Sequence, residues 1–432
     1  MSLPSGLGMS LAIQLIGSLA TVLATVFITR TYGPEGQGYL SYFRSTVDLA
    51  VSIGTFGLPQ AFVYMINSSL LSVGWALRFS RSYSILFALF AACIGAVFYA
   101  SGAAHVHGFD GIAVGCAVLA SAGLLAHGLY RAIALVTSST GIFNVVTVLP
   151  AVLILFFYFI ARPANFAVLV FAHVVASLLS VASVMAFLGR KKWPSHSLHG
   201  GLSILKYTAR YGMWSFVPHV GLTASAVGTY ALLRQGAGGV GAVGQFTVGV
   251  LVLSAAVLPL NMIIPILFNA WSGGAEELRR TSFIKLAHLG TLFSFLGLTA
   301  GVALAEPLTI IILGRDLLPS VAVTQIMLMG IFASYQTRLS SAFLLSLGRA
   351  DSVAIGAAIR AILIIALLAQ GFAESITATA VAWIVGEFAG VGYLLSKIVR
   401  MTGWPILTTL GLSPSWAVRE LITRRAFERW NP

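Results

Sequence analysis

The chain has 432 residues, of which 58% are hydrophobic and only 9% charged. Soluble domains are typically about a quarter charged, so this composition excludes an ordinary soluble protein and predicts a chain that crosses a membrane many times. The net charge of +13 calls for no nucleic-acid partner, because the uneven distribution of basic residues along the connectors accounts for it.

Twelve apolar runs follow one another along the chain, each near the ~20 residues that a transmembrane helix needs. They fall at residues 9–29, 39–66, 83–101, 111–131, 142–161, 165–189, 207–233, 243–270, 284–305, 319–346, 352–370 and 374–397. The longest polar connector, 189–206, separates six runs from six. The predicted fold is an all-α polytopic membrane protein with an amino-terminal half (1–195), a carboxy-terminal half (196–400) and a tail (401–432).

The basic residues predict the orientation. If the amino terminus is cytoplasmic, eighteen lysines and arginines fall on the cytoplasmic side and three lie within spans. Only four fall on the opposite side: Arg30, Arg162, Arg234 and Arg315. The positive-inside rule then places both termini in the cytoplasm. Within the tail, aromatic and aliphatic residues alternate with four arginines, which predicts an amphipathic helix on the inner leaflet.

Two charged residues, Arg44 and Asp48, lie inside the second apolar run. A charge in hydrocarbon is costly and usually faces a protein interior or a wet cavity, so it often marks a transport path. The spacing of four puts both residues on one face of a helix. Either they form an ion pair that neutralises itself, or they form a polar lining for a route through the membrane.

A second set of charges lies near the cytoplasmic ends of the last three spans. Arg338, Arg360 and Glu387 each fall about 12–15 Å from the inner surface at 1.5 Å per helical residue. Spans eleven and twelve are neighbours in the sequence, so Arg360 and Glu387 are predicted to form a structural ion pair. Arg338 is then the spare positive charge, and Glu387 is also a candidate proton carrier, because burial favours the neutral carboxyl.

Histidines near the middle of the bilayer are further candidates for ion coupling. His219 lies in span seven beside Pro218, where a bend is expected. His173 has a similar depth in span six, and His127 lies in span four. Such a histidine is more often a hydrogen-bonded residue than a proton relay, and we expect His219 to be the best candidate because its helix would move.

The two halves show weak internal similarity. Shifting the sequence by 206 residues places Gly38 on Gly244, and Arg30 and Arg234 end the first and seventh spans before glycine-rich turns. Six spans per half give both halves the same orientation. The repeat would therefore be parallel, related by an axis along the membrane normal.

Three motifs in the expected order resemble a known family. Residues 29–39, TRTYGPEGQGY, resemble the R-x-(L/Y)-G-P-E-x-x-G-x-Y signature that follows the first span of Wzx-type oligosaccharide flippases, members of the MOP exporter superfamily. Residues 345–351, LSLGRAD, and 306–314, EPLTIIILG, are similar to two further elements of that family. Unlike many relatives, the chain has no acidic residue in 222–233. The resemblance therefore does not imply a cation-coupling role at this position.

The resemblance implies two six-helix bundles around a central cavity and alternating access. It also implies a cargo, an undecaprenyl-pyrophosphate-linked oligosaccharide moved from the cytoplasmic to the outer leaflet of the bacterial inner membrane for polysaccharide export. Because arginine pairs with phosphate through two hydrogen bonds, four arginines are candidate substrate-binding residues, and Asp48 joins them as part of the polar lining beside Arg44. The set is Arg30, Arg44, Asp48, Arg234 and Arg338. The candidate ion-coupling residues are Asp48, His219 and Glu387. Membrane lipid and a polysaccharide polymerase or export machinery are the expected partners.

Two other function classes remain to be weighed. An enzyme is not expected, because the extracytoplasmic acids are scattered singly, and no metal site or cofactor motif is present. An ion-coupled drug antiporter of the same superfamily is the alternative. Cationic drugs favour carboxylates in the cavity, whereas the spans hold three arginines against two acids. The sequence leaves the sugar composition of the cargo, the driving ion and the oligomeric state open.

Overall fold

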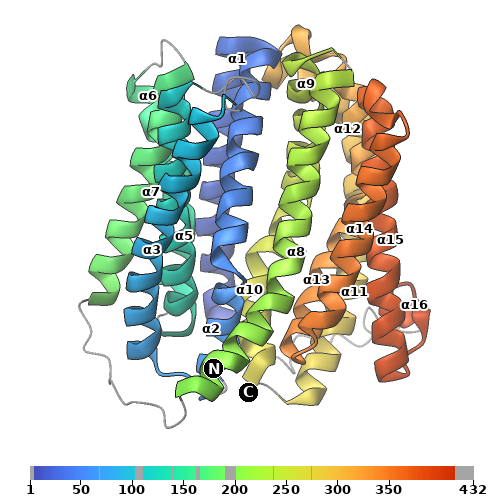
Figure 1. The fold of residues 1–432 in the computed structure, drawn as a ribbon. Coiled ribbons are helices and arrows are strands. Elements are labelled where there is room, and N and C mark those ends of the chain that lie inside the picture. Colours follow the sequence, from blue (N-terminus) through green and yellow to red (C-terminus); the bar gives the residue numbers. More distant parts are fainter. Residues whose placement is uncertain are drawn as a thin grey trace. The chain divides into compact units, whose positions relative to one another are not determined.

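The computed structural model describes residues 4–67, 69–102, 110–137, 140–161, 166–189, 201–236, 238–273 and 275–413, and helices form the regular structure in these ranges (Figure 1). The chain divides into two compact units. The amino-terminal unit is Gln14–Gly244, and the carboxy-terminal unit is Gln245–Pro432 together with Met1–Ile13. The domain boundary expected near residue 195 stays a prediction.

The first helix, α1 (Pro4–Thr55), contains two passes joined by a tight turn. Gly33 has φ +65° and ψ −166°, a conformation open essentially to glycine alone. Pro34 follows, with a φ suited to starting the next helical segment. Ile28 and Leu40, on either side of the turn, pack in the same buried cluster. The sequence Gly-Pro therefore reverses the chain between the first two apolar runs.

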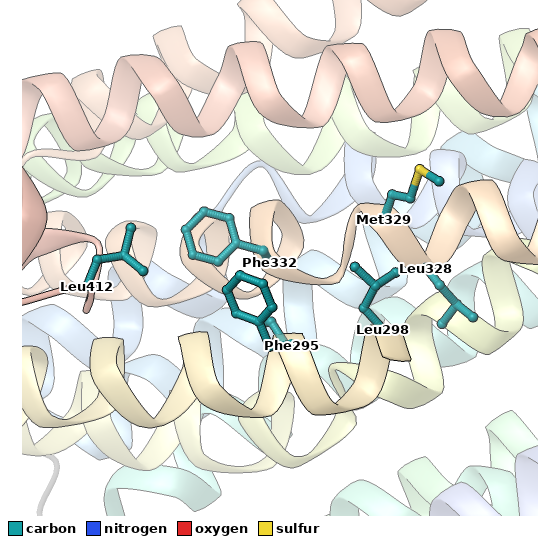
Figure 2. Close-up of a pocket in the computed structure, with 7 residues that line it drawn as sticks. Phe295, Leu298, Leu328, Met329, Phe332 and Leu412 are labelled. Carbon is teal, nitrogen blue, oxygen red and sulfur yellow. The ribbon is translucent and has the colours of Figure 1, made fainter. Parts of the chain in front are cut away.

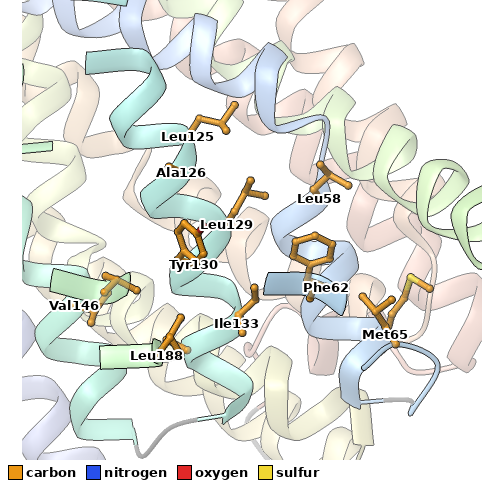
Figure 3. Close-up of a cluster of buried hydrophobic side chains, with 14 of the residues drawn as sticks. Leu58, Phe62, Met65, Leu125, Ala126, Leu129, Tyr130, Ile133, Val146 and Leu188 are labelled. Carbon is orange, nitrogen blue, oxygen red and sulfur yellow. The ribbon is translucent and has the colours of Figure 1, made fainter. Parts of the chain in front are cut away.

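The amino-terminal unit continues with a broken second pass and a group of packed helices. Phe56 and Gly57 have positive φ and separate α1 from α2 (Leu58–Asn67). The remaining helices are α3 (Val73–Ala100), α5 (Gly111–Thr137), α6 (Thr140–Ala161), α7 (Phe166–Gly189) and α8 (Gly201–Gly236). Figure 3 shows one core of this unit, in which Phe62 of α2 lies opposite Leu129 and Ile133 of α5, and Met65 of α2 belongs to the same cluster.

The carboxy-terminal unit begins within α9 (Val240–Ala256), which meets α10 (Leu258–Gly273) at a 61° bend. It continues with α11 (Glu276–Leu308), a π-helical turn η1 (Thr309–Leu313), η2 (Arg315–Leu317), α12 (Ser320–Met329), α13 (Ile331–Ser346), α14 (Ala350–Ala369), η3 (Phe372–Glu374), α15 (Ile376–Thr402) and α16 (Ile406–Thr409). Trp271, Phe283 and Phe343 lie at the centre of its core.

The number of membrane spans agrees with the prediction of a polytopic all-α protein. Within the described ranges, nine helices are long and apolar enough to cross a membrane, or ten when α9 and α10 count as one broken span. α1 counts as two passes because the chain reverses at Gly33, and α12 with α13 counts as one pass interrupted at Gly330. With α9 and α10 taken as one span, the total is then twelve. Large apolar side chains such as Leu86, 64% exposed on α3, cover the outer faces, as expected for helices in lipid.

The chain folds back after α15. Trp404 packs against Phe283 and Phe343. Further along, the carbonyl of Leu410 accepts a hydrogen bond of 2.6 Å from Thr291 of α11. Residues 404–412 therefore run back along α11, while the amphipathic helix predicted within 414–432 lies outside the described residues.

Candidate functional site

A buried polar cluster in the amino-terminal unit centres on Arg44. Its Nε donates a hydrogen bond of 2.8 Å to Nε2 of His173 on α7. Tyr158 of α6 places its hydroxyl 3.2 Å from Nδ1 of the same imidazole and also hydrogen-bonds Arg44. Phe43 packs edge-on against the ring, with centroids 6.2 Å apart. Three helices thus converge on one histidine and one arginine.

The contacts of His173 assign its protonation state. Arginine can only donate hydrogen bonds, so Nε2 of His173 must accept the one from Arg44. Nδ1 lies 3.1 Å from the backbone carbonyl of Leu169, which can only accept, so Nδ1 must carry the proton. Both contacts therefore assign the same neutral tautomer, and the charge of Arg44 is held by uncharged groups.

Asp48 follows Arg44 by one turn of α1, but the two do not form an ion pair in the described part of the chain. Its side chain is exposed. It lies near Tyr230 of α8, whose hydroxyl hydrogen-bonds Ser45 of α1. The contact that would make Arg44 and Asp48 a self-neutralising pair is absent in this conformation.

The other candidate residues of this unit lie on α1, α2 and α8. Arg30 is exposed, just before the turn at Gly33. Arg234 is half-buried in the last turn of α8, near Tyr42 of α1. His219 of α8 is exposed and contacts the side-chain amide of Gln60 on α2. The candidates from spans two and seven are therefore brought close to one another.

A seam of small residues joins the second pass of α1 to the start of α9. A methyl group at Gly244 would lie 1.9 Å from the carbonyl oxygen of Pro34, and one at Gly38 would lie 2.1 Å from that of Val240. The predicted repeat of 206 residues relates Gly38 to Gly244 and Pro34 to Val240. The two contacts are thus equivalent under the predicted repeat.

In the carboxy-terminal unit, Arg360 of α14 and Glu387 of α15 lie together, as the prediction of a pair required. Nη2 of Arg360 is 2.7 Å from Oε1 of Glu387, and both side chains are buried, 11% and 4% exposed. The guanidinium also lies over the ring of Trp383, 5.3 Å from its centroid. Gly390 allows the close approach, since a methyl group there would lie 3.1 Å from Cβ of Arg360.

Arg338 of α13 is the second arginine near this pair. Its Nη1 donates to the backbone carbonyl of Ser334, at 3.0 Å, and it interacts electrostatically with Glu387 and Arg360. Among the described residues, Arg338 has no carboxylate partner within ion-pair distance, because Glu387 is engaged by Arg360. The three side chains carry two positive charges and one negative charge.

An apolar groove lies on α11 to α13 of the same unit (Figure 2). Its volume is about 260 Å³. It is lined by Ser294, Phe295, Leu298, Leu328, Met329, Phe332 and Leu412. The lining is almost entirely hydrocarbon, so this groove suits an apolar chain and offers no recognition of a charged or sugar group.

Three partners in these clusters are poorly marked in the sequence. The depth of His173 in its span makes it a weaker candidate than His219, and Tyr158 does not stand out among the aromatic residues of span five. The only available signal was a hydroxyl among Phe156, Phe157 and Phe159. Trp383 was missed as well, because an aromatic residue in a span is normally read as packing.

No protein-family model matches the chain, and no curated protein matches its sequence. Solved structures do match in fold. The MATE transporter VcmN of Vibrio cholerae has a TM-score of 0.70 at 15% identity, over 92% of this chain and 97% of its own. An outward-facing multidrug resistance MATE transporter of the MOP superfamily has a TM-score of 0.69 at 13% identity, over 92% and 96%.

A third structure has the same fold, a MOP superfamily transporter from Pyrococcus furiosus described as having a binding pocket of reverse polarity. Its TM-score is 0.66 at 14% identity, over 92% of this chain and 96% of its own. At these identities the likeness concerns the fold. The chain is a multi-pass membrane protein with the fold of the MATE transporters of the MOP superfamily.

Proposed function

We propose that this protein is a transporter that moves a lipid-linked oligosaccharide across the bacterial inner membrane by alternating access, from the cytoplasmic to the outer leaflet. The cargo would carry an anionic pyrophosphate on a polyprenyl lipid, for use in polysaccharide export. Both termini would be cytoplasmic, and a polysaccharide polymerase would act on the product.

One observation carries the proposal. Arg44 and Arg338, one in each unit, are held by uncharged acceptors, the imidazole of His173 and the carbonyl of Ser334. Among the described residues neither forms an ion pair with a carboxylate. An arginine in a membrane span is costly unless it serves a polar function, and its geometry matches phosphate through paired hydrogen bonds. The motif at residues 29–39 supports the same cargo class.

A drug antiporter of the same superfamily is the second candidate, favoured by the multidrug transporters among the structures of similar fold. Such a cargo is commonly cationic and would need carboxylates. Asp48, exposed and without an ion-pair partner among the described residues, is the group that supports this alternative.

Transport assays with two probes separate the candidates. Purified protein in liposomes would be given a fluorescent polyprenyl-pyrophosphate disaccharide, scored by quenching of the outer leaflet, and ethidium as a cationic drug. We expect the pyrophosphate lipid to be flipped. Arg44→Ala and Arg338→Ala should each slow flipping about ten- to 150-fold, because a hydrogen bond to a charged group contributes about 1.5–3 kcal/mol.

The matched control is Arg315→Ala, which removes an exposed arginine from η2 and should leave flipping unchanged. Transport of ethidium without flipping of the lipid would favour the antiporter. Normal flipping by both arginine variants would contradict the cationic pathway.

A further inference from the structure

The contact between Arg44 and His173 depends on a single lone pair. Nδ1 of the imidazole carries a proton directed at Leu169 or Tyr158, so Nε2 has the one lone pair that remains. Arg44 uses that lone pair at 2.8 Å. A proton and the guanidinium N–H therefore compete for the same atom.

We propose that His173 is a proton-binding site that controls Arg44. A proton taken from water onto Nε2 displaces the Arg44 hydrogen bond and places two positive charges side by side, so that Arg44 turns toward an anion. When the proton leaves, His173 again accepts from Arg44. The nature of the anion, a pyrophosphate group, rests on the proposed function; the competition for the lone pair does not.

The surroundings of His173 favour this competition. From α1 it meets Arg44, with Asp48 one turn further, and from α6 it meets Tyr158. Arg44 is the only charged group acting on the imidazole in the described part of the chain, and α5, which also packs on α7, contributes none. No carboxylate therefore stabilises an imidazolium in this part of the chain, and the positive charge of Arg44 opposes it until the guanidinium moves away.

Thermodynamic linkage makes the effect reciprocal. An anion that draws Arg44 from His173 returns the lone pair to the imidazole and removes a neighbouring positive charge, so proton binding becomes tighter. By the same factor, a proton on His173 makes anion binding tighter. Proton and anionic cargo would thus bind together and leave together, and the proton site would differ from the predicted candidates Asp48, His219 and Glu387.

His127 provides a matched control within the same unit. It is also buried in a span, and its Nε2 lies 3.1 Å from the carbonyl of Val146. That contact uses an N–H rather than a lone pair; Arg131 acts on His127 electrostatically, but in the described part of the chain it makes no hydrogen bond to the imidazole. Replacing His127 removes a buried imidazole without touching Arg44.

Nitrogen NMR of histidine-labelled protein in lipid nanodiscs tests the site directly. At pH 8 the ring of His173 should carry its proton on Nδ1, and Arg44→Gln should make proton binding to Nε2 at least tenfold tighter. A proton on Nε2 at pH 8 in the wild type would overturn the proposal even if the variant failed to fold. So would a titration that Arg44→Gln leaves unchanged.

Calorimetry with inorganic pyrophosphate tests the coupling. Titrations in buffers of different ionisation enthalpy count the protons taken up on binding. Wild type and His127→Gln should take up a measurable fraction of a proton, whereas His173→Gln, whose amide oxygen can still accept from Arg44, should take up none. Binding of pyrophosphate without proton uptake by the wild type would refute the coupling and leave the proposed cargo intact. Failure to bind pyrophosphate would count against the proposed function, and the NMR result would then decide the proton site alone.

Discussion

Replacing Gly244 with alanine should loosen the seam between α1 and α9. The new methyl carbon would lie 1.9 Å from the carbonyl oxygen of Pro34, whereas ordinary contact begins at 3.4 Å. The helices must therefore separate by about 1.5 Å at this point, the difference between those two distances. A backbone carbonyl cannot rotate away as a side chain can. Overpacking of this kind costs about 1–3 kcal/mol, which lowers the population of the closed seam about five- to 150-fold.

Distances between two spin labels measure the effect. Cysteines introduced at the exposed positions Thr31 and Gln235 would carry the labels, in a background where Cys93 and Cys116 are replaced by serine. Gly244→Ala should add a population at longer distance. Because the repeat relates the two contacts, Gly38→Ala should change the distances in the same direction.

Gly128→Ala is the control for this experiment, because nothing lies within 4 Å of a methyl group at that position of α5. It should leave the distances unchanged and stabilise the helix slightly, by roughly 0.5–1 kcal/mol. If Gly244→Ala gave the same distance distribution as the wild type, the seam would not be a close backbone contact and the reasoning from the repeat would fail.

Two stability predictions concern the ion pair and the turn. Glu387→Ala should leave the buried charge of Arg360 uncompensated and destabilise the protein by about 3–5 kcal/mol, seen as a lower thermal unfolding temperature in detergent. The double change Arg360→Met with Glu387→Leu should recover most of that loss, and no recovery would mean that the pair does more than neutralise itself. Gly33→Ala should cost about 1–3 kcal/mol through backbone strain alone, since a methyl group there meets nothing within 4 Å. Wild-type stability of this variant, compared with Gly115→Ala as an unstrained control, would argue against a turn at Gly33.

The helical spans were predictable because hydropathy depends on local sequence alone. A run of about 20 apolar residues must be helical in lipid, where no water satisfies the backbone. The breaks within spans were not predictable in the same way. Phe56 adopts a positive φ beside Gly57, and the 61° bend between α9 and α10 occurs at Val257, two residues before Pro259. Proline also lies inside an unbroken helix of this chain, as Pro150 does in α6, so such residues alone do not locate a break.

The partners of the charged residues within the spans likewise differ in how far the sequence predicts them. The contact between Arg360 and Glu387 could be predicted because α14 and α15 are consecutive helices joined by a short connection, so that depth in the membrane nearly determines the partner. The partner of Arg44 could not, since His173 lies 129 residues away. Only the packing of α1, α6 and α7 decides whether that arginine meets Asp48 on its own helix or an imidazole on another.

Local sequence is enough to identify a membrane protein of many helices with a few charges inside its spans, because the hydrophobic effect and the cost of burying charge act residue by residue. Which of those charges are neutralised depends on the packing of helices that are distant in the sequence. Arg44 and Arg338 donate hydrogen bonds to uncharged acceptors, and Glu387 forms its ion pair with Arg360. These partners follow from how the helices pack, which local sequence does not specify.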